Sequence, residues 1–182
     1  DQVVLAGFRA AHRARPGLKL ILAPRHPRRG DAIAAHLGVS GLTWARRSAG
    51  EPPDTETAVY LADTLGEMPL WYALAGITFV GGSLVPRGGH TPFEPAQARS
   101  ALLHGPDVAN FAAIYAALDA GGGAVEVADA DGLAGALGQL ATVQAQAAQA
   151  DRALAVLARQ DSAGELVQYT IRILRGLIAG PG

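Results

Sequence analysis

The sequence predicts an α/β fold in which helices cover both faces of a parallel sheet of about six strands. Segments with the composition of strands alternate with segments of helical periodicity along the whole chain, which is typical of repeated βα units. The strand segments are uniformly apolar rather than alternating, as expected for strands buried on both faces. We therefore expect one Rossmann-like domain over residues 1–182, with no boundary inside it.

Six short segments have the composition of strands. The clearest are residues 18–23, which Pro24 closes, and residues 77–80, which run into a pair of glycines. The other predicted strands cover residues 42–45, 58–62, 101–104 and 124–128.

Helical patterns precede, separate and follow these strands. Residues 3–15 carry apolar side chains at helical spacing and end before Pro16, and residues 69–75 begin with proline and end at Gly76. The other predicted helices cover residues 31–37, 93–98, 108–118, 131–140 and 143–178, the last with a break near Ser162.

The composition excludes several classes of protein. The chain has 182 residues, of which 49% are apolar and 17% charged, so it can bury a core and is not a disordered chain. A net charge of -1 does not favour nucleic-acid binding. Cysteine is absent, which excludes disulfides and thiolate chemistry. The histidines lack the spacing of a helical metal site, so we expect neither a metal nor a cofactor. They are His12, His26, His36, His90 and His104.

Two features bear on the setting of the domain. No apolar run approaches the ~20 residues that cross a bilayer, and no signal peptide is recognisable, so we expect a soluble domain. The chain contains one methionine, Met68, so residue 1 is not a translational start as written. We therefore expect the chain to be a fragment of a larger protein.

Polar and glycine-rich loops follow four of the predicted strands. In an open parallel sheet, ligands bind in the crevice beyond the carboxyl ends of the strands. The loops at those ends cover residues 24–27, 63–68, 81–95 and 105–106. We expect them to converge on one ligand site.

Individual loop residues have a functional and a structural interpretation. Arg25, between two prolines, suits bidentate binding of a phosphate or carboxylate, or is a surface arginine in a rigid turn. The glycine pairs at 81–82 and 88–89 let backbone amides approach a phosphate, or simply form tight turns. Glu94 accepts the hydroxyls of a ribose, or forms a capping box with Thr91.

Several well-known site motifs are missing. The chain contains neither a P-loop nor a G-x-G-x-x-G fingerprint, which argues against an ATPase and an ordinary NAD-dependent dehydrogenase. Ser83 lacks the G-x-S-x-G elbow of a hydrolase, and Glu67 is equally well explained as a carboxylate at a helix start.

The loops resemble the C-terminal half of bacterial Kdo (3-deoxy-D-manno-octulosonic acid) transferase. The matching motifs are Ala-Pro-Arg-His-Pro at 23–27, Asp-Thr-Leu-Gly-Glu-Met at 63–68, Gly-Gly-Ser-Leu-Val-Pro-Arg-Gly-Gly-His at 81–90, and Phe-Glu-Pro at 93–95. They follow the family's order over essentially the whole chain. The resemblance implies half of a GT-B glycosyltransferase, in which two Rossmann-like domains flank the active site. It also implies transfer of Kdo from CMP-Kdo to a lipid A precursor at the cytoplasmic face of the inner membrane, in lipopolysaccharide biosynthesis and without a metal.

The resemblance assigns roles to particular residues. Arg25 is expected to meet the donor's phosphate or sugar carboxylate, and Glu94 its ribose. The other residues expected to bind the donor are His26, Gly66, Glu67, Met68, Gly81, Gly82, Ser83, Gly88, Gly89, His90 and Thr91. Thr91 stands where the family usually has Asn, and residues 97–101 replace a Gly-x-Pro run.

The resemblance also implies what this chain lacks. The family's general base is a Glu of the N-terminal domain, so we expect no catalytic residue here. The acceptor site and any membrane association are expected in the missing part. We expect the chain alone to bind CMP or CMP-Kdo weakly and to transfer nothing. The alternatives are another GT-B nucleotide-sugar enzyme, such as a UDP-sugar transferase or an epimerase, and a non-catalytic nucleotide-binding module.

Overall fold

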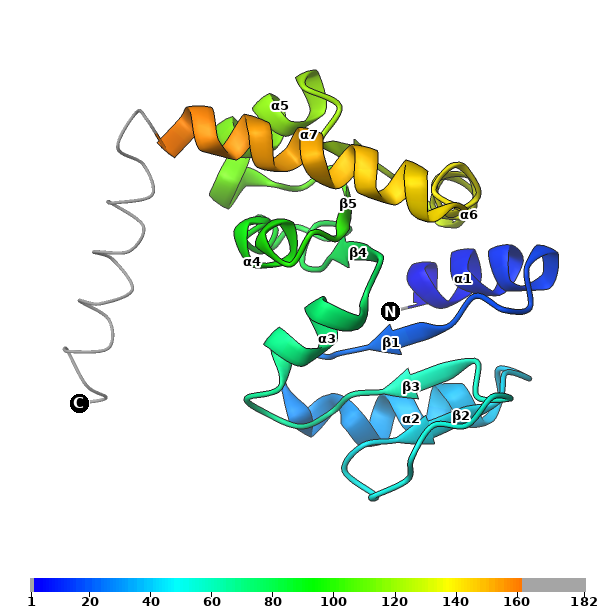
Figure 1. The fold of residues 1–182 in the computed structure, drawn as a ribbon. Coiled ribbons are helices and arrows are strands. Elements are labelled where there is room, and N and C mark those ends of the chain that lie inside the picture. Colours follow the sequence, from blue (N-terminus) through cyan, green and yellow to red (C-terminus); the bar gives the residue numbers. More distant parts are fainter. Residues whose placement is uncertain (1, 162–182) are drawn as a thin grey trace, which may run out of the picture.

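The computed structural model describes residues 2–161, in which strands and helices alternate as expected (Figure 1). The six strands of this part of the chain form two parallel three-stranded sheets, in the orders β1-β3-β2 and β4-β5-β6. The strands are β1 (Leu20–Leu22), β2 (Trp44–Arg46), β3 (Val59–Leu61), β4 (Ile77–Val80), β5 (Ala101–His104) and β6 (Ala124–Glu126). The predicted α/β class and all six predicted strands are confirmed.

The strand pairing differs from the expected single sheet. Within residues 2–161, each strand pairs only with strands of its own three-stranded sheet, called a trio below. The strands in a position to link the two trios, β1 and β4, are not paired with each other. In the first trio Ile21 of β1 lies opposite Tyr60 of β3, and in the second Phe79 of β4 lies opposite Leu103 of β5. Because all the pairs are parallel, the carboxyl ends of each trio lie at one edge.

The helices agree with the predicted ones within a few residues. They are α1 (Gln2–Ala14), α2 (Gly30–Gly38), α3 (Met68–Leu74), α4 (Phe93–Gln97), α5 (Ala112–Ala120), α6 (Ala130–Gln139) and α7 (Val143–Asp161). Short 3₁₀ turns, η1 (Pro27–Arg29) and η2 (Ala109–Phe111), precede α2 and α5, so α5 begins later than expected. The predicted break near Ser162 and the helix beyond it lie outside the described residues.

Helix α1 joins the two sheets. Phe8, which is 2% exposed, packs with Leu5 into the core beneath β3 and α2, while Val4 and Ala11 contact the core between β5 and α6. Leu18, just before β1, contacts both cores. The helix packs against α6 (Figure 1). The two trios are therefore held together by side-chain packing rather than by strand pairing.

The two sheets are covered differently. Residues of α4, α5 and α7 form the core on one face of β4-β5-β6, and α1 and α6 cover the other. The β1-β3-β2 sheet has α1 and α2 on one face, whereas Trp71 of α3 packs with Tyr60 and Ala45 on the other. None of the helices within residues 2–161 has both the length and the apolar character of a membrane span.

Candidate functional site

The loops after β1 and β4 meet through Arg25 and His90. Arg25 Nη1 lies 3.2 Å from His90 Nδ1. A guanidinium can only donate, so Nδ1 accepts this hydrogen bond and the imidazole is neutral, with its hydrogen on Nε2. Burial lowers the pKa of His90 below its ordinary value, and the neighbouring Arg25 and His26 lower this pKa further. Two motifs that are 65 residues apart in the sequence thus form one polar surface.

The glycine-rich loop after β4 folds back on itself. The His90 N–H donates to the Gly81 carbonyl at 3.1 Å, and the Gly89 N–H donates to the Gly82 carbonyl at 3.0 Å. Gly82 has a φ of +73°, and a Cβ there would lie 3.3 Å from His90 Nε2. The left-handed backbone conformation therefore favours glycine beneath the imidazole ring, and a Cβ there would be in tight contact with the ring.

Ser83 holds two loops together. Its side chain is fully buried, and its hydroxyl donates to the Val80 carbonyl at 2.6 Å. The same oxygen accepts from the Gly105 N–H at 2.8 Å. A Cβ at Gly105 would lie 2.3 Å from the Ser83 carbonyl oxygen, so only glycine fits there. The hydroxyl of Ser83 thus serves the packing of the loops after β4 and β5.

Asp107 and Asn110 support the second glycine pair, and Asp107 is a residue that the sequence interpretation missed. The Asp107 carboxylate accepts from the backbone N–H groups of Arg87 (2.5 Å) and Gly88 (2.7 Å), and these bonds, that of Gly88 foremost, lower the pKa of the Asp107 carboxyl. Asn110 Nδ2 donates to the carbonyls of Arg87 (3.1 Å) and Gly89 (3.2 Å). The available signal in the sequence was the position of Asp107, which lies two residues after Gly105 and directly after one of the predicted site loops.

The two glutamates have different surroundings. Glu67 forms an ion pair with Arg47, whose Nη2 lies 2.6 Å from Oε1, and also accepts from the Thr64 hydroxyl. These interactions, chiefly the hydrogen bonds from Arg47, lower the pKa of Glu67 to about 2. Glu94 lies exposed in the first turn of α4, and within residues 2–161 its carboxylate has no hydrogen bond or ion pair. Glu94 is therefore available to a ligand, whereas Glu67 is already paired.

No capping box forms at the start of α4. The N-cap residue is Pro92, without a side-chain bond to the helix, and the Thr91 hydroxyl accepts from the Phe93 N–H at 3.3 Å instead. The structural interpretation of Glu94 as a capping-box residue is therefore wrong. The hydroxyl of Thr91 thus accepts a hydrogen bond within its own turn.

The remaining expected residues lie in the same set of loops without direct contacts to Arg25. Gly66 is exposed with a φ of +81°, and Met68, which begins α3, is 38% exposed. His26 is exposed beside Arg25. Within the described residues, no hydrogen bond or ion pair joins residues 66–68 to Arg25 or His90.

Asp63 anchors the loop after β3. Its buried carboxylate accepts from Arg46 Nε at 2.7 Å and from the hydroxyl and N–H of Ser48. Burial acts to raise the pKa of Asp63, but the hydrogen bonds from Arg46 and Ser48 outweigh it and the pKa is lowered. A Cβ at Gly30 would lie 2.4 Å from Asp63 Oδ2, so α2 approaches this ion pair closely.

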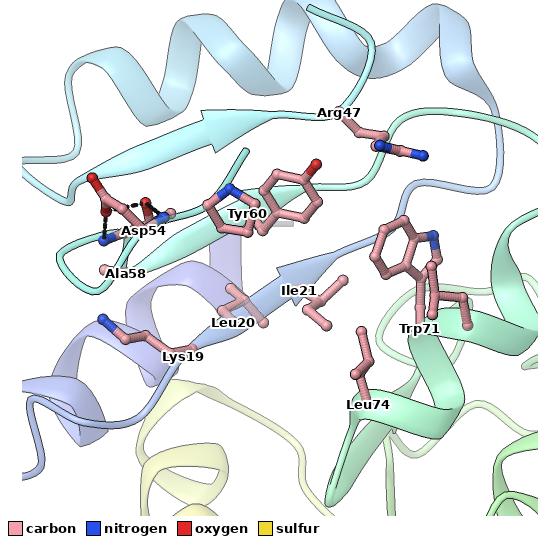
Figure 2. Close-up of a pocket in the computed structure, with 12 residues that line it drawn as sticks. Lys19, Leu20, Ile21, Arg47, Asp54, Ala58, Tyr60, Trp71 and Leu74 are labelled. Atoms are coloured by element: carbon pink, nitrogen blue, oxygen red, sulfur yellow. Dashed lines mark hydrogen bonds between the residues drawn. The ribbon is translucent and has the colours of Figure 1, made fainter. Parts of the chain in front are cut away.

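Two hollows lie away from these loops. One, of about 390 Å³, lies on the β1-β3-β2 sheet beside α3, where the rings of Tyr60 and Trp71 meet edge to face with centroids 5.8 Å apart (Figure 2). The other, of about 520 Å³, includes Arg9, Arg13 and Lys19. Neither includes Arg25, His90 or Glu94.

Comparison with known proteins agrees with this geometry, although no family model matches the chain. The 3-deoxy-D-manno-octulosonic acid transferase of Haemophilus influenzae is 39% identical over 127 residues, which are 70% of this chain and 30% of that protein. The enzyme of the same name from Bordetella pertussis is 43% identical over 126 residues, 68% of this chain and 29% of that protein. The chain thus spans less than a third of the length of these relatives.

A solved structure covers most of the chain. It is the crystal structure of the C-terminal CMP-Kdo binding domain of WaaA from Acinetobacter baumannii, which is 34% identical and superposes with a TM-score of 0.80. The match covers 86% of this chain and 82% of that one. The parallel βα architecture with a glycine-rich carboxyl edge defines a Rossmann-like ligand-binding domain. The chain belongs to the Kdo transferase family, in which it corresponds to the C-terminal domain.

Proposed function

We propose that this chain is the donor-binding domain of a Kdo transferase and that it binds CMP-Kdo at the carboxyl edge of its strands. The observation that carries the proposal is the pairing of Arg25 with a neutral His90, in a set of loops that also includes Glu94, whose carboxylate has no partner within residues 2–161. The likeness to a CMP-Kdo binding domain at a TM-score of 0.80 supports the same assignment.

The side chains at this edge match the chemistry of the donor. CMP-Kdo carries a phosphodiester and a sugar carboxylate, and the planar guanidinium of Arg25 can bind either oxyanion through two parallel hydrogen bonds. The free carboxylate of Glu94 can accept hydrogen bonds from the two ribose hydroxyls. The glycines at 81–82 and 88–89 allow a close approach of the ligand to the backbone.

The remaining donor-binding residues follow from the same proposal. Gly66, Glu67 and Met68 line the nucleotide pocket, with Glu67 held in place by Arg47. His26, beside Arg25, adds a polar group at the phosphate. Ser83 and Thr91 shape the loop through their own hydrogen bonds.

The full-length protein, in this proposal, transfers Kdo to a lipid A precursor at the cytoplasmic face of the inner membrane, in lipopolysaccharide biosynthesis. Transfer requires a base within hydrogen-bond reach of the acceptor hydroxyl. We place that base, the acceptor site and membrane association in an N-terminal domain. The chain alone then binds donor and transfers nothing, so turnover by residues 1–182 would contradict this part of the proposal.

Nucleotide titration tests the proposal. Calorimetry and thermal shift with CMP, CDP, UDP and NAD should show binding of CMP in preference to the others. Arg25→Ala and Glu94→Gln should each weaken CMP binding about tenfold to a hundredfold, the loss expected for a hydrogen bond to a charged group. Arg28→Ala, from the same loop, and Glu56→Gln, from the opposite edge, are matched exposed controls and should leave affinity unchanged.

Two outcomes would redirect the assignment. Binding of UDP without a response to CMP would favour a UDP-sugar enzyme of the same architecture. CMP binding that is unaffected by both Arg25→Ala and Glu94→Gln would overturn the proposed site.

A further inference from the structure

A buried aromatic pair lies beneath the glycine-rich loop and has no role in the function proposed above. Tyr115 of α5 and His104 at the end of β5 both have 0% of their surface exposed. Their ring centroids are 4.4 Å apart, with an angle of 47° between the ring planes. Such a tilted contact fixes the orientation of both rings.

The hydroxyl of Tyr115 contacts the glycine-rich loop after β4. It donates to the His90 carbonyl at 2.9 Å. Burial raises the pKa of Tyr115, so the phenol keeps its proton and remains a donor. The His90 N–H is bonded in turn to the Gly81 carbonyl. The backbone of His90 is therefore held at its N–H by the loop and at its carbonyl by α5.

His104 holds the ring of Tyr115 in place. Its Nδ1 lies 2.8 Å from the Gly105 carbonyl oxygen, and its Nε2 lies 2.9 Å from Asp119 Oδ1. Each ring nitrogen thus faces an acceptor, of which a neutral imidazole can donate to one, and rotation of the ring would move both nitrogens away from these oxygens. Asp119 belongs to the same helix as Tyr115, so His104 also connects α5 to the end of β5.

We propose that Tyr115 is a positioning residue for the donor site, which acts through the His90 backbone to hold the His90 imidazole against Arg25. Without the phenol hydroxyl, the His90 carbonyl loses its partner and the loop can move away from Gly82. Arg25, an exposed side chain, then loses the acceptor that orients its guanidinium. The consequence for the ligand rests on the proposed function, whereas the effect on His90 does not.

Titration of His90 by NMR in the ligand-free chain tests the geometric part. Tyr115→Phe keeps the ring on His104 and removes only the hydroxyl, and Tyr60→Phe removes a hydroxyl from the other sheet as a matched control. In the wild type the pKa of His90 lies below its ordinary value because the ring is buried and faces Arg25 and His26. Tyr115→Phe should raise this pKa toward the ordinary value, and Tyr60→Phe should leave it unchanged. An unchanged pKa in Tyr115→Phe, or equal changes in both variants, would overturn the proposal.

CMP titration of the same variants tests the consequence for binding. Tyr115→Phe should weaken CMP binding about fivefold, the effect of one lost hydrogen bond. If the wild type does not bind CMP, the proposed function fails while the His90 titration still decides the positioning role. If Tyr115→Phe binds CMP as the wild type does, the positioning role is overturned.

A second variant keeps the test decisive if Tyr115→Phe does not fold. His104→Asn removes the ring that supports Tyr115 and leaves the phenol hydroxyl in place. His104→Asn should also raise the pKa of His90, but by less than Tyr115→Phe does. Folding of each variant is checked by circular dichroism, and no rise in a folded His104→Asn would contradict the proposal.

Discussion

Arg25 Nη1 and His90 Nδ1 are 3.2 Å apart, and this contact ties the loop after β1 to the loop after β4. The contact requires a neutral imidazole, because a protonated one would have no acceptor and would repel the guanidinium. The positively charged group that is proposed to meet the donor is thus oriented by a group whose charge changes with pH.

Acidification should therefore weaken the fold through His90. The pKa of His90 is lowered in the folded chain, so the unfolded chain binds its proton first as the pH falls below about 6.5. Stability due to this group is present at neutral pH and is lost as the pH falls through the lowered pKa. Urea unfolding at pH 7.5, 6 and 5 should show this loss in the wild type and a smaller one in His90→Gln. Equal losses in both proteins would assign the pH dependence to other groups.

Glu67 should remain ionised in acid. Its pKa of about 2 results from hydrogen bonds with Arg47 and Thr64, and the stability it contributes is present above the ordinary carboxyl pKa of 4.5 and lost as the pH falls toward 2. NMR titration should show a charged Glu67 at pH 3 in the wild type. Arg47→Gln should return the pKa toward 4.5, and Arg28→Gln, which is exposed in another loop, should not.

Replacement of Gly88 by alanine should destabilise the glycine-rich loop after β4. Its φ is +76°, and a Cβ would lie 2.5 Å from the Asn110 side chain. Gly50 has a similar φ of +73° with open space around it, so Gly50→Ala isolates the backbone cost of about 1–2 kcal/mol. Gly88→Ala should cost about 1–3 kcal/mol more, the usual range for overpacking, in the free energy of unfolding measured with urea. Equal costs would show that Asn110 moves away freely.

Replacement of Gly7 by alanine should destabilise the fold, although alanine has the higher helix propensity. In an isolated helix, alanine is more favourable than glycine by about 1 kcal/mol. Gly7 faces α6, where a Cβ would lie 2.7 Å from the Ala130 carbonyl oxygen and 2.9 Å from Leu133 Cβ. Gly7→Ala should therefore destabilise the fold by about 1–3 kcal/mol. Gly135→Ala, in α6 with nothing within 4 Å, should be neutral or stabilising. A stabilised Gly7→Ala would mean that α1 and α6 can separate at little cost.

The strands that were predicted best are those with sharp boundaries. The predicted strands at 77–80 and 101–104 agree with β4 and β5 at both ends, because glycine follows each apolar run. The prediction at 18–23 is longer than β1, since its outer residues continue the apolar run without pairing. Strand pairing was less predictable, because apolar composition alone does not distinguish one six-stranded sheet from two packed trios.

The loops that form the candidate site were predicted from the sequence. Whether each of their side chains is free, paired or buried was not predicted. The parallel arrangement of the strands was sufficient to expect that the loops with Arg25 and His90 would meet. Besides a neighbour three residues away, Glu67 and Ser83 each have a partner about 20 residues away in the sequence, Arg47 and Gly105, and nothing in their own loops indicates these distant partners. Tyr115 carried no signal at all, because an apolar helix position looks the same whether or not its hydroxyl has a partner.

Local patterns were thus enough to establish the order and type of the elements and the edge at which the polar and glycine-rich loops gather. They suffice because apolar periodicity, prolines and glycines act on the backbone within a few residues. Whether a side chain at that edge is free, paired or buried depends on segments that packing brings together across the fold. For that reason only the tertiary structure distinguished the carboxylate of Glu94, which has no partner within residues 2–161, from the paired carboxylate of Glu67.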